Sequence, residues 1–122
     1  MNSYVAPYAK QWLVKFHKAI GDRYGDKMVI FISHNRIFNS PSCCMSKSKF
    51  QKAHPETLIK DSISQYGGYT KVQIVVDGNV VSTAKHNFGK NENFCRSLGA
   101  MVAIRKAMST NADYKSFANS IR

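Results

Sequence analysis

Apolar side chains recur every three or four residues near both ends of the chain, which is the spacing of an amphipathic helix. Residues 5–20 predict an N-terminal helix with Pro7 in its first turn and Gly21 as its stop. Residues 94–108 predict a second strong helix, and residues 111–121 predict a short helical tail. The apolar stripe of the first helix consists of Val5, Tyr8, Ala9, Trp12, Leu13, Phe16 and Ile20.

Alternation of apolar and polar residues predicts a hairpin in the middle of the chain. Residues 69–76 form the first arm, Asp77-Gly78 supplies the tight turn, and residues 79–88 return as the second arm. Residues 28–32 are instead an unbroken apolar run. Such a run is typical of a strand that is covered on both faces and is central in its sheet.

The segment between these strands is more polar. Residues 33–54 predict a long connection, and residues 55–66 predict a helix that Gly67-Gly68 ends. Four residues of the connection are candidates for a lid that closes over an anion, and a mobile loop is the alternative. These residues are Asn35, Arg36, Lys47 and Lys49.

The order of elements predicts an α+β fold: a small, mostly antiparallel sheet with N-terminal and C-terminal helices packed on it. We expect one domain over residues 1–122, with a core at 1–108 and a helical tail at 109–122. We also expect a homo-oligomer. Its candidate contact surfaces are the aromatic stripe of Trp12 and Phe16 and the tail stripe of Tyr114, Phe117 and Ile121, although core is the favoured interpretation of the first stripe.

The chain has a large excess of positive charge. Lys and Arg number 18 against 7 Asp and Glu, which gives a formal net charge of +11. Such an excess favours an anionic partner, either nucleic acid, a nucleotide or an acidic protein surface, although lysines also serve as solvated surface charge. Arginine makes fork-shaped contacts to phosphates, so the arginines are the residues to examine. They are Arg23, Arg36, Arg96, Arg105 and Arg122.

Several classes of protein are excluded by the pattern. No apolar stretch approaches the ~20 residues of a membrane span and no signal-peptide pattern is evident, so we expect a cytoplasmic protein without a membrane partner. No Cys-x-x-Cys occurs, and reduced thiols are favoured over a zinc site made by Cys43, Cys44 and His54. Hydrolase, metalloprotease and phosphate-loop motifs are also missing. We therefore expect a binding protein, not an enzyme, with no metal and no cofactor.

Arg105 is the most unusual residue of the predicted helix over residues 94–108. It lies near the centre of an apolar arc of about 120° on the helical wheel. A guanidinium there needs an anion or acceptor groups. One interpretation is contact with a ligand phosphate; the other is a structural arginine that reaches solvent, a carboxylate or helix carbonyls.

The start of the same helix carries further candidates. Backbone N–H groups at a helix N-terminus attract anions, and Lys90, Asn93 and Arg96 are placed to assist. Asn91 or Asn93 is also a natural N-cap. Phe88 and Phe94 bracket the loop, and they predict either stacking on a base or anchoring of the loop in the core.

A resemblance covers roughly the last 45 residues before the tail. It runs through Gly67-Gly68-Tyr69-Thr70, Asp77-Gly78, Ala84-Lys85-His86, residues 91–96, Gly99, Ala103 and Arg105-Lys106-Ala107. This pattern is similar to phage-encoded Thoeris anti-defence sponge proteins. The resemblance implies an oligomeric, non-enzymatic protein of the host cytoplasm that sequesters a cyclic ADP-ribose-type signal or a cyclic oligonucleotide.

A second resemblance competes for the same stretch. The order helix, strand, strand, strand, helix, with residues 75–81 before a final Ala-rich helix, resembles a double-stranded RNA-binding domain. That family places lysines at the start of its last helix, where this chain has Asn91-Glu92-Asn93. The connection over residues 33–68 is also far longer than a hairpin loop.

The function favoured by the sequence is therefore sequestration of a phosphate-bearing nucleotide, and the alternative is binding of nucleic acid. The candidate ligand-binding residues are Arg105, Arg96, Asn93, Phe88, Phe94, Lys90, His86 and Arg36.

Overall fold

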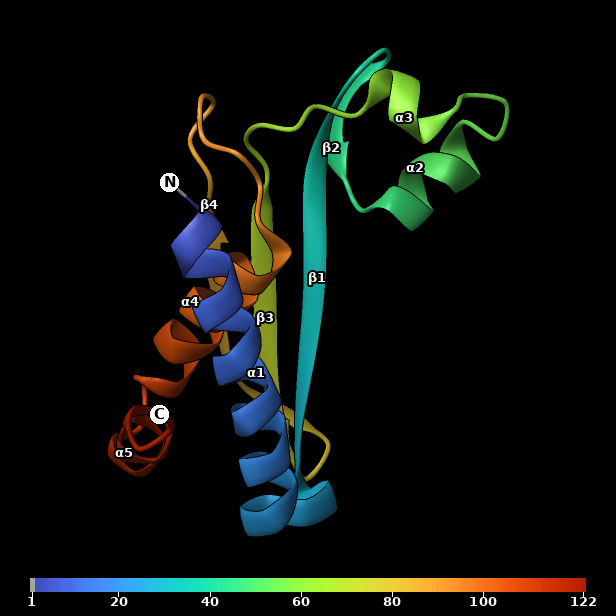
Figure 1. Ribbon diagram of the computed structural model, residues 1–122. Coiled ribbons are helices and arrows are strands. Elements are labelled where there is room, and N and C mark those ends of the chain that lie inside the picture. The colour runs from blue at the N-terminus through green and yellow to red at the C-terminus, as the bar shows by residue number, and fades with distance from the viewer. Residues whose placement is uncertain (1) are drawn as a thin grey trace.

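The computed structural model describes the backbone from Asn2 to Arg122 and the side chains from Ala6 onward (Figure 1). Five helices and a four-stranded antiparallel sheet of order β2-β1-β3-β4 confirm the predicted α+β class. None of the described helices is both long and apolar enough to cross a bilayer. The elements are α1 (Asn2–Tyr24), η1 (Gly25–Lys27), β1 (Met28–Asn39), β2 (Ser42–Met45), α2 (Lys47–Ala53), α3 (Ile59–Ser62), β3 (Tyr69–Val76), β4 (Asn79–Asn87), α4 (Arg96–Met108) and α5 (Ala112–Asn119).

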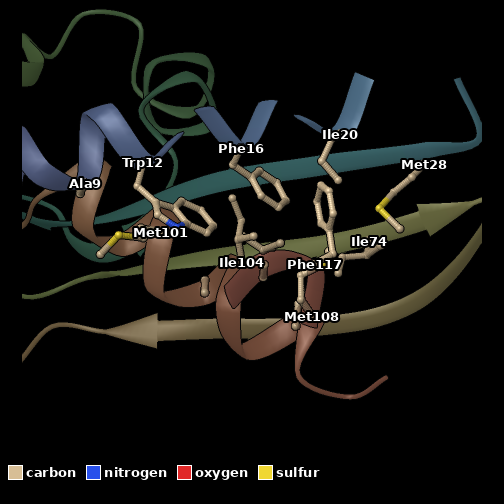
Figure 2. Packing of buried hydrophobic residues seen from close by; sticks show 14 residues of the cluster. Ala9, Trp12, Phe16, Ile20, Met28, Ile74, Met101, Ile104, Met108 and Phe117 are labelled. Carbon is tan, nitrogen blue, oxygen red and sulfur yellow. The ribbon is translucent and has the colours of Figure 1, made fainter. Parts of the chain in front are cut away.

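The main core lies between the helices and one face of the sheet. Figure 2 shows Trp12 and Phe16 of α1 above Ile104 of α4 and Ile74 of β3. The rings of Trp12 and Phe16 are stacked with centroids 4.9 Å apart, and Phe117 of α5 packs against Phe16 at 6.0 Å. α5 follows α4 and completes this layer.

This core corrects one prediction about oligomers. Trp12 is 1% exposed, Phe16 is fully buried and Phe117 is 8% exposed within a single chain. The interpretation of these residues as a contact surface is therefore wrong, and the interpretation of Trp12 and Phe16 as core is confirmed. Tyr114 and Ile121 of the tail stripe also pack against the same core.

β1 differs from its prediction in length and in burial. It continues to Asn39, pairing with β3 over residues 28–35 and with β2 over residues 36–39. Val29 is 42% exposed and Phe31 is 56% exposed, so the expectation of a strand covered on both faces is wrong. A short apolar run shows that a strand is present, but it carries no information on which face a helix covers.

Residues 40–68, here named the excursion, form an insertion between β1 and β3 that includes the edge strand β2. The predicted loop over 33–54 and the predicted helix over 55–66 are both wrong. The end of β1, the strand β2 and the helix α2 fill most of the first segment, and Ser46 caps α2 by accepting a hydrogen bond from Lys49 N. Only the single turn of α3 is helical in the second segment, because Ile63 bridges Phe38 and the chain is extended there.

Candidate functional site

A cavity of about 250 Å³ lies where the far end of β1, the start of α2 and the start of α4 meet. Three of its side chains are cationic, one is a histidine, and none is a carboxylate. We name it the arginine pocket. Its lining consists of Ile32, His34, Arg36, Lys47, Ser48 and Arg96.

Arg36 is the most constrained cation of the pocket. Its guanidinium carbon lies 4.4 Å from the centroid of the Phe94 ring, and Nη2 donates to the carbonyl of Ser64 at 3.0 Å. Nε is buried without a hydrogen-bond partner. Burial and the neighbouring Arg96 both lower the pKa of Arg36. A bound anion would satisfy Nε and neutralise the repulsion between the two arginines.

His34 faces the pocket as a neutral ring. Its Nδ1 lies 2.9 Å from Thr70 Oγ1, and its ring meets Phe94 edge-on with centroids 5.7 Å apart. Burial, followed by the charges of Arg96 and Arg36, lowers the pKa of His34 to about 4. The pocket therefore holds a polar group that adds no further positive charge at neutral pH.

Arg96 is the first residue of α4, and the N-terminus of this helix is uncapped by side chains. Cys95 is the N-cap residue and makes no side-chain cap hydrogen bond. The first amides of a helix carry partial positive charge, which adds to that of Arg96. The predicted caps are wrong: Asn93 pairs with Tyr66 and Phe94 N donates to the carbonyl of Gln65 at 2.8 Å, so the chain is still extended there.

Two glycines bring the elements of the pocket into close contact. A Cβ at Gly99, in the first turn of α4, would collide with Thr70 of β3. Gly68 has a φ of +82°, and a Cβ there would collide with the carbonyl of Asn35 and approach the Phe94 ring. Glycine at these positions lets α4 and Phe94 approach the sheet beside Arg36.

The aromatic residues do not present free faces for stacking. Phe88 is 6% exposed, with its ring centroid 5.0 Å from that of Phe94 and 4.7 Å from that of His86. Arg36 covers one face of Phe94. The expectation that Phe88 stacks on a base is wrong, and its interpretation as a core anchor is confirmed. His86 is half-buried on β4, outside the pocket lining, and burial followed by Lys106 lowers its pKa.

Arg105 lies far from the pocket. It follows Arg96 by nine residues, about two and a half helical turns, which places the two on opposite sides of α4. Its guanidinium carbon lies 5.0 Å from the ring centroid of Trp12. Arg105 is therefore not among the side chains that line the pocket with Arg96. Lys90 is also separate, in the exposed turn where Gly89 N donates to Glu92 Oε1.

The structure thus brings together Arg36, Arg96 and Phe94 from the predicted set. Sequence reasoning missed His34 and Ser48 as pocket residues. In an extended strand His34, Arg36 and Phe38 lie on one face, and this spacing could have indicated that His34 lies beside Arg36. The prediction of a loop over these residues left that spacing unused.

Comparisons with protein-family models, curated proteins and solved structures find no match for this chain. Within the described residues, no group of three or more His, Cys, Asp or Glu side chains is placed to hold a metal ion.

Proposed function

We propose that the protein binds a phosphate-bearing nucleotide through the arginine pocket and sequesters it unchanged. The observation that carries the proposal is the pair Arg36 and Arg96, which line the same cavity without a carboxylate among the lining residues. Arginine forks form charge-assisted, two-pronged hydrogen bonds with phosphate oxygens. Lys47, at the start of α2, supplies a third positive charge to the lining.

The recognised part of the ligand is its phosphate group. Phe88 is buried, Arg36 covers one face of Phe94, and about 250 Å³ is below the roughly 300–1,000 Å³ of cavities that bury most of a ligand. The nucleoside portion therefore extends outside the pocket, over the excursion or the start of α4. A cyclic ADP-ribose-type signal or a cyclic oligonucleotide, the ligands that the sponge-protein resemblance implies, carries suitable phosphates.

Double-stranded RNA is the second candidate ligand. The observation that favours it is the arrangement of α1, β1, β3, β4 and α4, with both long helices on one face of an antiparallel meander. The excursion is then an insertion between the first two strands of the meander. In this alternative the arginine pocket takes one backbone phosphate, at the end of the sheet where α4 begins.

Calorimetric titration tests the proposal with three probes: cyclic ADP-ribose, a cyclic dinucleotide and pyrophosphate. We expect Arg96→Ala and Arg36→Ala to weaken binding about 10- to 100-fold, because each removes a charge-assisted hydrogen bond of about 1.5–3 kcal/mol. Arg122→Ala removes the same charge at the exposed C-terminus and serves as the matched control. Ligand recovered intact after heat denaturation of the complex would support sequestration, and recovery of a cleaved product would contradict it.

Salt dependence separates the two candidates. Affinity for an RNA duplex falls steeply with salt concentration, in proportion to the number of phosphates neutralised, whereas a ligand with two phosphates responds weakly. Binding of the duplex alone, weakened by Arg96→Ala, would favour the second candidate. Equal binding of every probe by the wild type and Arg96→Ala would contradict both.

A further inference from the structure

The face of the sheet opposite the helices is uncovered and carries a distinct set of side chains. Odd-numbered residues of β1 and β3 point to it, and Phe31 is its most exposed aromatic residue at 56%. We name it the open face. Two rows of side chains run across β1, β3 and β4 on this face. One row consists of Phe31, Gln73 and Thr83, and the next consists of Ser33, Lys71 and Lys85.

The charge of the open face is positive and unbalanced. Lys71 lies directly opposite Lys85 in the register of β3 and β4, and the Lys85 ammonium lies 4.9 Å from the ring centroid of Tyr69. None of the residues in β1, β3 or β4 is Asp or Glu. Two like charges directly opposite each other destabilise a sheet, and a bound anion would relieve their repulsion.

A shallow cavity adjoins this lysine pair. It has a volume of about 260 Å³, and Phe31, Ser33, Lys71 and Gln73 contribute to its lining together with Ile32. An exposed aromatic ring beside a cation is the combination that holds single-stranded nucleic acid, because the ring stacks on a base while the cation contacts the backbone. The amide of Gln73 adds hydrogen-bonding groups between them.

We infer that the open face binds single-stranded nucleic acid, with a base stacked on Phe31 and backbone phosphates at Lys71 and Lys85. A second copy of the chain fits this face less well, because each copy has a net charge of +11 and an isologous contact would join two lysine pairs. Apart from Ile32, which lines both cavities, the residues of this site differ from those of the arginine pocket, to which β1 contributes the even-numbered residues Ile32, His34 and Arg36.

Fluorescence anisotropy with a labelled oligouridine of about 12 nucleotides tests the inference, since such platforms bind roughly 4–16 nucleotides. We expect Phe31→Ala to weaken binding about tenfold, which corresponds to the loss of one base stack. Lys71→Gln should weaken binding and reduce the slope of log affinity against log salt by about 0.7. Arg122→Ala, which removes a charge at a residue outside the lining of both cavities, should leave the affinity for oligouridine unchanged.

Circular dichroism establishes whether each variant is folded. If Phe31→Ala does not fold, the binding measured with Lys71→Gln still tests the inference. Absence of oligouridine binding at low salt would overturn the inference, as would unchanged affinity in the folded variants of the open face. If analytical sedimentation shows a dimer of the wild type and a monomer of Phe31→Ala, the open face binds a second copy of the chain and the inference is overturned. Loss of oligouridine binding in Arg96→Ala alone would also overturn the inference, because it would assign this probe to the arginine pocket.

Discussion

The helix layer and the excursion are held by cores of very different size. The helix layer buries fourteen clustered side chains, among them Trp12, Phe16 and Ile104. The excursion depends mainly on Phe50, which is fully buried and stacks on Phe38 of β1 with centroids 3.9 Å apart. The arginine pocket takes Arg96 from one region and Lys47 from the other. Ligand affinity is therefore sensitive to the smaller core even when the larger core is intact.

The largest effect is expected from damage to the larger core. Phe16→Ala removes a fully buried ring that contacts Trp12 and Phe117. We expect the free energy of unfolding to fall by about 3–5 kcal/mol, measured by chemical denaturation. A loss below about 1 kcal/mol would show that the helices do not stabilise the sheet in this way.

Phe50→Ala should have a smaller and more local effect. We expect a loss of about 3 kcal/mol, at the low end for a buried ring, confined to the excursion. Hydrogen exchange should show faster exchange in β2 and α2, with protection retained in β3 and β4. Phosphate-ligand affinity should fall as well, because Lys47 and the carbonyl that Arg36 binds both belong to the excursion. Uniform loss of protection would contradict the division into two regions.

The third prediction concerns the effect of acid pH on the free energy of unfolding through His34. Between the ordinary pKa of 6.5 and its own pKa of about 4, the unfolded chain binds a proton that the folded chain does not. The free energy of unfolding should therefore fall as pH falls through this window, by about 1–2 kcal/mol after allowance for partial solvent exposure. His34→Gln should remove this part of the pH dependence in urea melts at several pH values. An unchanged slope would show that another group is responsible.

The smallest effect is expected at Arg105. Arg105→Ala removes a cation that lies over the Trp12 ring within the helix layer, so stability should fall by about 1 kcal/mol. Affinity for the phosphate ligand should stay within about twofold of the wild type, a change below about 0.5 kcal/mol. A thermal melt beside a titration measures both. Abolished binding in a stable variant would restore Arg105 as a ligand-binding residue.

The parts of the fold that the sequence predicted are those with a strong local period. The helical stripe of α1, the alternating arms of β3 and β4 around Asp77-Gly78, and the stripe of α4 all follow the pattern of their residues. The excursion lacks such a period. Its structure depends on Phe38 stacking on Phe50, a contact between residues twelve positions apart that no window of helical or strand spacing contains.

The candidate site was predictable only in part for the same reason. Arg96 was identified because it lies beside a helix start, and Arg36 because arginines are few. Their convergence depends on the pairing of β1 with β3 and on the close approach of Gly99 to Thr70, which are both tertiary contacts. Arg105 lies outside the pocket because its guanidinium packs over the Trp12 ring, and the sequence does not show which ring lies opposite a cation in an apolar arc.

The excursion also determines how the sheet must assemble. β3 and β4 meet across Asp77-Gly78, and β1 and β2 meet across residues 40–41, so both hairpins close over short loops and form early. The pairing of β1 with β3 joins Asn35 to Tyr69 and Met28 to Val76, and its loop must first close around the whole excursion. Long-range pairing slows folding, so we expect a variant with the excursion shortened to a tight turn to fold faster and to lack Lys47 in the pocket.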